Sequence, residues 1–140
     1  MKRTLLVIAA AAAVLIAPTN GRAHGTSFGE TVTVGADELI PNAPGKRLVS
    51  HIVDYSPGAS SAAHRHAGSA FIYAYVIAGE IRSQVDGEPA RVYRTGEAWF
   101  EKPGAYHRVS ANASDTAPAR LLAVLIVDAG DEQLVIPDPQ

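Results

Sequence analysis

The chain has 140 residues, which is enough for one domain and too few for two. It contains no cysteine, which excludes a disulfide, a catalytic thiol and a cysteine-linked lipid within this sequence. Its 12 basic and 14 acidic residues give a formal charge of −2 at pH 7, and no run of Lys or Arg occurs. Nucleic acid is therefore a poor candidate partner.

Residues 1–23 have the pattern of a secretory signal peptide. Lys2 and Arg3 form a short positive region, and an unbroken apolar run follows from Leu5 to Ala17. Gly21-Arg22-Ala23 then supplies small residues at the positions that a signal peptidase reads. A membrane anchor and a buried N-terminal helix are the alternatives, but a membrane-spanning helix needs ~20 apolar residues and this run is shorter. We therefore predict cleavage after Ala23 and export to the periplasm or the exterior.

Cleavage would leave residues 24–140 as a single domain without a membrane segment. Three of the twelve basic residues and none of the fourteen acids belong to residues 1–23, so the formal charge would fall to −5. A chain of this charge without a basic run is a poor candidate for binding anionic membranes.

The remaining sequence predicts short strands separated by turns. Four stretches are rich in β-branched, aromatic and aliphatic residues: Thr31–Val34, Leu48–Tyr55, Phe71–Ala78 and Ala119–Val127. Four shorter stretches alternate more regularly: Ile81–Val85, Arg91–Tyr93, Ala98–Phe100 and His107–Ser110. Asp86-Gly87 is the best hairpin signal, because both residues tolerate positive φ. No amphipathic helix or internal repeat is present, so we expect an all-β sandwich or barrel.

Two of the predicted strands differ from the others. Phe71–Ala78 and Ala119–Val127 are apolar at both odd and even positions. Strands that read as continuous apolar runs are typically covered on both sides. We therefore predict that these two are central strands buried on both faces.

The histidines carry the strongest functional signal. His64 and His66 are two residues apart, so on a strand their side chains point to the same face. Two such imidazoles can both reach a metal ion ~2.1 Å away. His107 follows the Pro103-Gly104 turn and offers a third ligand from a distant strand. A His-x-His pair alone is a weak signal, because an exposed polar strand face has the same pattern. We interpret His51 as a surface or core histidine without a functional role.

The surroundings of these histidines resemble the two sequence motifs of small single-domain cupins. The first motif is carried by Gly58, His64-Arg65-His66 and Tyr75–Glu80, and the second by Gly96, Pro103-Gly104-Ala105-Tyr106-His107 and Asn112. The resemblance extends from about Lys46 to Val127. It implies a double-stranded β-helix, or jelly-roll barrel, of the cupin type-2 class.

The resemblance also implies a ligand set and a partner. His64, His66 and His107 would hold one divalent metal ion. We favour Fe2+, although Mn2+, Zn2+, Ni2+ and Cu2+ also suit histidine ligands. Small cupins often pair through sheet edges, so the resemblance favours a homodimer.

One departure from the cupin pattern affects the chemistry. The family's first motif normally has a glutamate ligand soon after the His-x-His pair, but no acid occurs from Ala67 to Ala78. Three neutral imidazoles would leave the ion at +2, which favours an anionic or chelating ligand. Glu101, on the strand leading to His107, is a candidate fourth ligand or ligand partner. The slightly favoured alternative is that Glu101 is a solvated acid at a strand end.

Two classes of function are left open. The first is an enzyme resembling mononuclear non-haem iron dioxygenases, acting on a small chelating or anionic substrate. Its candidate catalytic residues are Glu101, Tyr73 and Gln84, the last only if its strand face lines the barrel. The second is a non-catalytic module that binds or senses a metal or small ligand, favoured by the missing glutamate. The fold does not separate these classes, but O2 consumption with candidate substrates would.

Overall fold

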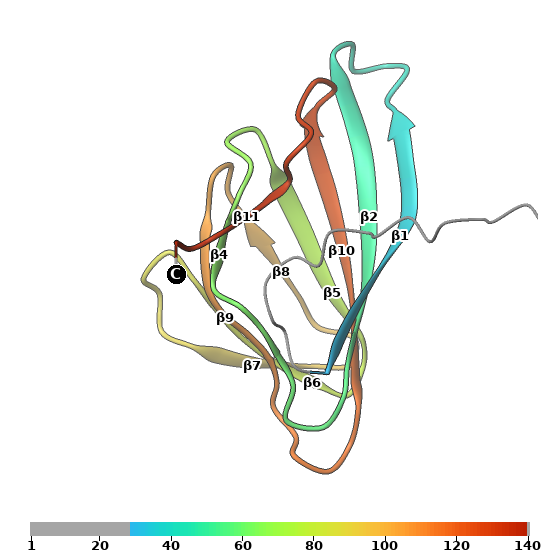
Figure 1. Ribbon diagram of the computed structural model, residues 1–140. Coiled ribbons are helices and arrows are strands. Elements are labelled where there is room, and N and C mark those ends of the chain that lie inside the picture. The colour runs from blue at the N-terminus through green and yellow to red at the C-terminus, as the bar shows by residue number, and fades with distance from the viewer. Residues whose placement is uncertain (1–28, 140) are drawn as a thin grey trace, which may run out of the picture.

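A computed structural model describes residues 29–139, which form eleven strands and no helix (Figure 1). Five strands make one antiparallel sheet, here called sheet A, in the order β1 (Glu30–Leu39), β2 (Lys46–Tyr55), β10 (Ala119–Asp128), β5 (Phe71–Ala78), β8 (Ala98–Glu101). The others make sheet B, in the order β11 (Val135–Pro137), β4 (His64–His66), β9 (Tyr106–Asn112), β6 (Glu80–Val85), β7 (Arg91–Arg94), with β3 (Ser60–Ser61) paired to β9. This part of the chain holds no helix that could cross a membrane. The predicted signal peptide of residues 1–23 lies outside the described residues.

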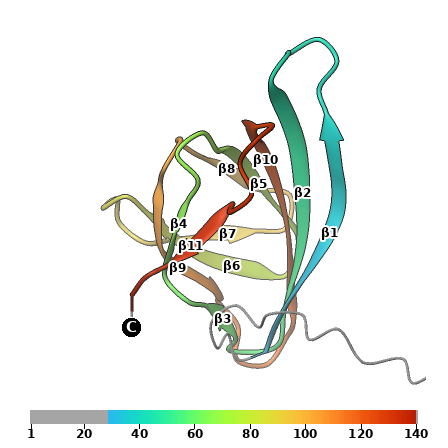
Figure 2. The ribbon, with the colours of Figure 1, turned by 45° about the horizontal axis from the view of Figure 1, so that its top comes forward.

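The all-β prediction is confirmed, and each of the eight predicted strands is present. Asp86 and Gly87 both have positive φ, of 55° and 125°, in the turn between β6 and β7, as the hairpin signal predicted. The structure adds β3, β4 and β11, which are too short to give a periodic signal. β1 and β2 extend past the other strands as a long hairpin (Figure 2).

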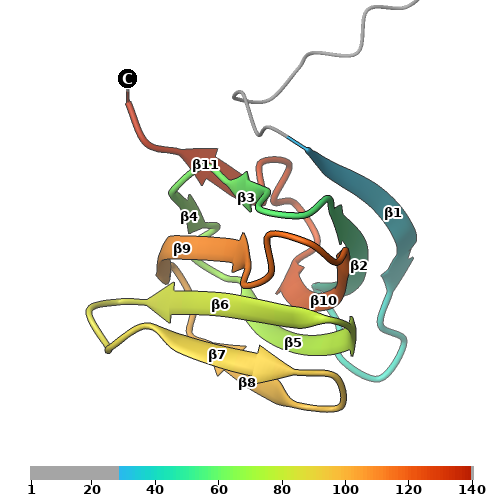
Figure 3. The same ribbon diagram turned by 90° about the horizontal axis from the view of Figure 1, so that it is seen from below.

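The two sheets face each other as the halves of a jelly roll (Figure 3). The chain passes directly from β5 of sheet A to β6 of sheet B at Gly79. Gly79 has φ +73°, and a Cβ there would lie 2.6 Å from the carbonyl oxygen of Pro118. Only glycine fits both conditions, so the corner between the sheets depends on it.

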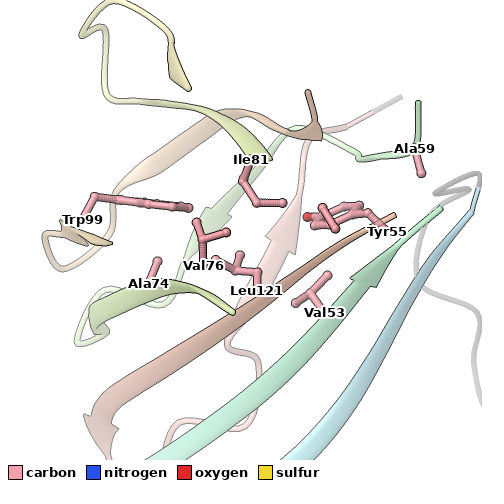
Figure 4. Close-up of a cluster of buried hydrophobic side chains, with 9 residues drawn as sticks. Val53, Tyr55, Ala59, Ala74, Val76, Ile81, Trp99 and Leu121 are labelled. Carbon is pink, nitrogen blue, oxygen red and sulfur yellow. The ribbon is translucent and has the colours of Figure 1, made fainter. Parts of the chain in front are cut away.

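The core lies between the sheets and is divided into two apolar clusters. The larger one joins side chains of both sheets, including Val76 and Leu121 of sheet A and Ile81 of sheet B (Figure 4). Tyr55 adds a polar bridge, because its hydroxyl lies 2.6 Å from Ser61 Oγ and 2.9 Å from Ser110 Oγ. These contacts connect sheet A to sheet B beside the space that holds the histidines.

The prediction that β5 and β10 are buried on both faces is wrong. In β5, Ile72, Ala74 and Val76 are buried, whereas Phe71 and Ile77 are 44% and 38% exposed. β10 alternates in the same way. Sheet B covers only the inner face of these strands, and no other layer of residues 29–139 covers the outer face.

Candidate metal centre

The three predicted ligands come together on the inner face of sheet B. β4 and β9 are antiparallel neighbours in which His64 is directly opposite His107. His66 points to the same side as His64, because it lies two residues further along β4. One ring nitrogen from each histidine lies within 4.8 Å of the others. The three residues therefore form a group that could hold a metal ion.

The protonation of these rings suits metal binding. His64 Nδ1 lies 2.7 Å from the carbonyl oxygen of Ala62, so Nδ1 donates and Nε2 keeps its lone pair. Burial lowers the pKa of His107 to about 4, and burial also lowers the pKa of His64. Both rings are thus neutral at pH 7, which is the form that coordinates metals.

Glu101 is part of this site, which corrects the slightly favoured alternative of a solvated acid. It is 2% exposed, because its position opposite Ile72 in the sheet turns it to the inner face of sheet A. Its Oε2 lies 3.0 Å from His66 Nε2, and its Oε1 lies 3.3 Å from His107 Nδ1. Trp99 Nε1 donates to Oε1 at 3.0 Å and holds the carboxyl group in place.

The charge of Glu101 follows from these neighbours. Burial alone would raise the pKa of its carboxyl group, but the His66 and His107 rings and Trp99 together bring the pKa below its usual value. Glu101 is therefore ionised at pH 7. It would reduce the net charge of a divalent site from +2 to +1, although it comes from sheet A and not from the first motif.

The donor atoms that remain unpaired fit a metal ion. Neither ring nitrogen of His66 has an aligned hydrogen-bond partner within residues 29–139, and the same holds for Glu101 Oε2. Buried polar atoms without partners are costly and rare. A divalent cation bound by one ring nitrogen of His66 and by Glu101 Oε2 would satisfy those two atoms, with ligand types that iron, manganese, nickel, copper and zinc all accept.

The site opens into a cavity of about 1220 Å3 between the two sheets. Most of its wall is apolar, formed by side chains such as Val49, Leu125 and Leu134. Its charged lining residues are Arg47 and four acids, Glu30, Asp37, Glu101 and Glu132. Arg47 Nη1 contacts both carboxylate oxygens of Asp37, at 2.7 and 2.5 Å, so its charge is already paired.

His51 also lines this cavity, and sequence reasoning missed it. It lies on β2, opposite Ala123 of β10, so its side chain points inward from sheet A. Burial and the nearby His66 lower the pKa of His51, while Asp37 opposes the shift. The alternation of Val49, His51 and Val53 along β2 was the available signal, because it puts His51 on an apolar inward face.

The other two candidate catalytic residues lie elsewhere. Tyr73 is on the outer face of sheet A, where its ring packs against Tyr75 and Phe100 at centroid distances of 6.3 and 5.3 Å. Gln84 is outside sheet B, and its Nε2 donates to the carbonyl oxygen of Glu88. Neither residue lines the cavity, so the structure does not bring them to the histidines.

Comparisons with known proteins show a family match and a shared fold. The sequence profile of the cupin domain family matches residues 51–125, which include His51, all three clustered histidines and Glu101. A curated relative, the cupin-domain-containing oxidoreductase fogC of Aspergillus ruber (strain CBS 135680), is 28% identical over 78 residues. The match covers 56% of this chain and 37% of that protein, so this chain spans well under half the length of its relative.

Solved structures show the same fold at low sequence identity. An oxalate oxidase in complex with the substrate analogue glycolate matches with a TM-score of 0.56 and 23% identity, over 81% of this chain and 63% of that one. KdgF from Halomonas sp. matches with a TM-score of 0.56 and 19% identity, over 74% and 85% of the two chains. A cupin domain of an XRE family transcriptional regulator from Enterobacter cloacae gives 0.55 and 21%, over 69% and 95%.

Proposed function

The chain belongs to the cupin domain family, and we propose that it binds one divalent metal ion and uses it as an oxidoreductase acting on a small chelating molecule. The observation that carries this proposal is the group of His64, His66 and His107, whose ring nitrogens lie within 4.8 Å of one another beside the buried Glu101 carboxylate at the wall of an apolar cavity. Bound there, the metal would supply Lewis acidity and, with Fe2+, a redox centre for reactions with O2. Fe2+ is the metal that we propose.

The protein's own residues define the molecule that would bind. Apolar walls favour a substrate with an apolar body and exclude water from the site. The acids at the cavity wall disfavour a polyanion, because Glu30 and Glu132 are negatively charged and Asp37 already pairs with Arg47. A small chelating molecule with at most one negative charge fits these surroundings better than a strongly anionic one.

His51 would act on the bound molecule from the wall opposite the metal ligands. Its ring is neutral at pH 7, because its pKa is lowered, and a neutral imidazole can accept a proton. It projects from sheet A, whereas the three clustered histidines belong to sheet B. We therefore assign to His51 the role of proton acceptor, separate from metal binding.

The experiment compares His107→Ala with His51→Ala, the same substitution at two histidines of one cavity. Metal analysis of the purified proteins should find about one ion per chain in the native protein and in His51→Ala. His107→Ala should lose the ion. Its metal affinity should fall by more than the roughly 10–100-fold that follows loss of a residue that only hydrogen-bonds a ligand. Equal retention in both variants, or no metal in the native protein after reconstitution, would contradict the proposal.

O2 consumption then tests the reaction. 2-Oxo acids, 1,3-dicarbonyls and 2-aminothiols are suitable small chelating molecules for a first panel. Turnover with one of them should disappear in His107→Ala, and in His51→Ala it should fall by roughly 100-fold or more while the metal is retained. Consumption that persists in His107→Ala would show that the reaction does not use this site.

A non-catalytic ligand-binding role is the second candidate. The observation in its favour is that Tyr73 and Gln84 lie outside the cavity, which reduces the set of acid–base groups near the metal ligands. In that case the chelating molecules would bind to the metal-loaded protein, as calorimetry would detect, without any consumption of O2.

We also propose that the protein is exported and loses residues 1–23, leaving residues 24–140 as one cupin domain. The charged start, the apolar run and the small residues before position 24 support this proposal. Intact mass of the protein recovered from the periplasm or the medium should correspond to a chain that begins at His24. A full-length chain in the cytosol would contradict export.

A further inference from the structure

Ser83 is a buried polar residue on the inner face of sheet B, and the metal site described above does not include it. It lies on β6 and is 3% exposed. Its side chain points to the same side as that of Ile81, two residues earlier, because side chains alternate along a strand. β6 pairs with β9, where Ser83 is directly opposite Ser110. His107 belongs to the same strand β9, so Ser83 lies beside one of the three clustered histidines.

The Ser83 hydroxyl contacts one end of the His107 ring. Ser83 Oγ lies 3.0 Å from His107 Nε2, and the two residues are only 3% and 4% exposed. The other ring nitrogen of His107, Nδ1, lies 3.3 Å from Glu101 Oε1. The second oxygen of this carboxylate, Oε2, lies 3.0 Å from His66 Nε2. Nδ1 of His107 therefore faces the candidate metal site, whereas Nε2 faces Ser83.

The neighbours of the His107 ring favour this orientation. A half-turn about the Cβ–Cγ bond would put carbon atoms where Nδ1 and Nε2 now lie. The ring would then present C–H groups to Ser83 and to the Glu101 carboxylate, and both polar contacts would be lost. Buried polar groups without partners are costly, so the orientation that keeps both contacts is the more stable one. Trp99 packs against the ring in a T-shaped arrangement, at 6.4 Å between centroids, and limits its movement.

The two nitrogens of a neutral imidazole have different roles when one of them binds a metal. The ligand nitrogen uses its lone pair, and the other nitrogen carries the single proton. For His107, a ligand Nδ1 leaves the proton on Nε2, which is buried and needs an acceptor; Ser83 Oγ is at the right distance. His64 has the opposite arrangement, because its Nδ1 lies against the carbonyl oxygen of Ala62. The two histidines are directly opposite each other in the sheet, yet they present different nitrogens.

We propose that Ser83 is a positioning residue for His107: its hydroxyl oxygen accepts the Nε2 proton and thereby makes Nδ1 the nitrogen that binds the metal ion. This inference rests on the metal binding proposed above and extends it to a residue that is not a ligand. Ser83 is absent from the lining of the cavity, so its effect on the metal passes through the His107 ring.

The test compares Ser83→Ala with Ser110→Ala, two truncations of buried serines that are opposite each other in sheet B. Ser110 is 5% exposed, and its hydroxyl contacts Tyr55 and not a histidine. The metal used is Zn2+, because it is diamagnetic and accepts imidazole ligands. Competition with a chromophoric chelator should show that the affinity for Zn2+ falls roughly 10-fold or more in Ser83→Ala. In Ser110→Ala it should equal that of the native protein.

Nuclear magnetic resonance of the Zn2+-loaded native protein gives a second readout, which a merely structural role of Ser83 would not determine. Long-range nitrogen–proton correlation spectra distinguish a metal-bound ring nitrogen from a protonated one. They should show the proton of His107 on Nε2 and the proton of His64 on Nδ1. In Ser83→Ala the Nε2 proton of His107 should lose the downfield shift that a hydrogen bond gives.

Two results would overturn the role of Ser83 and leave metal binding intact. One is a His107 proton on Nδ1 in the loaded native protein, and the other is an equal Zn2+ affinity in Ser83→Ala and Ser110→Ala. A native protein that binds neither Zn2+ nor Fe2+ would contradict the proposed function itself, and the role of Ser83 with it. Circular dichroism and the melting temperature establish that each variant is folded before the affinities are compared.

Discussion

The inner and outer faces of sheet A are built from the same strands, yet their side chains differ in chemistry. The inner face combines apolar residues with Tyr55, His51 and Glu101, each of which is placed in the cavity or between the sheets. The outer face of β5 and β8 carries aromatic and aliphatic side chains with no charged group among them. Polar groups on the inner face are therefore confined to positions where a partner or a ligand can satisfy them.

This difference indicates that the two faces of sheet A have separate roles. Residues on the inner face connect sheet A to the histidines of sheet B, so a change there affects both packing and the metal site. No further layer of residues 29–139 covers the outer face, so a change there should affect packing less and leave the metal site unchanged. Substitutions of the same type on the two faces separate these effects.

The largest difference is expected for isoleucine truncation on β5. Ile72 is 1% exposed on the inner face, whereas Ile77 is 38% exposed on the outer face. Ile72→Ala should lower the free energy of unfolding by about 2–5 kcal/mol, because it leaves a cavity in the core. Ile77→Ala should cost less than about 1 kcal/mol.

Denaturant unfolding of both variants measures the two losses of unfolding free energy. Similar losses for the two variants would mean that the outer face is as important for the fold of one chain as the inner face. The distinction between the faces would then be lost.

A smaller effect is expected for Glu101→Gln on the inner face. The substitution keeps the shape of the side chain and removes the negative charge beside His66 and His107. Metal affinity should fall by roughly 10-fold or more, because carboxylates beside metal-binding histidines increase affinity. Competition with a chromophoric chelator measures it.

Glu97→Gln is the matched control, because Glu97 is an exposed acid paired with Arg91 and lies just before the same strand. Its metal affinity should equal that of the native protein. An unchanged affinity in Glu101→Gln would mean that the buried carboxylate has no part in metal binding.

The smallest effect is expected for Tyr55→Phe. The substitution removes a hydroxyl that contacts Ser61 and Ser110, and it should cost about 1 kcal/mol at pH 7. Burial raises the pKa of Tyr55 to about 12 in the folded protein. Tyrosine in an unfolded chain loses its proton near pH ~10. The stabilisation that comes from the neutral Tyr55 hydroxyl is therefore complete below pH ~10. It is lost as the pH rises through the pKa of Tyr55 in the folded protein.

Unfolding free energies between neutral and strongly alkaline pH measure this loss. The native protein should lose stability over that range, and Tyr55→Phe should lose less. Tyr75→Phe removes a hydroxyl from the outer face and serves as the control. A pH profile that Tyr75→Phe flattens as much as Tyr55→Phe would contradict the assignment to Tyr55.

Local sequence patterns were sufficient to predict the eight longer strands, the Asp86-Gly87 turn and the grouping of His64, His66 and His107. The strands and the turn depend on residues close together in the chain. The grouping of the histidines depends on the order of the two cupin-like motifs along the sequence. The three histidines needed only a strand period of two and one antiparallel neighbour to come together. The metal itself stays a prediction that the metal analysis must test.

Only the tertiary structure decided which face of each strand is the inner one. A period of two says that Tyr73 and Tyr75 share a side, but in a strand that is apolar at both odd and even positions it does not say which side faces the cavity. That choice depends on pairing with strands far away in the sequence. It turned Tyr73 and Gln84 outward, and it turned Glu101 and His51 toward the histidines.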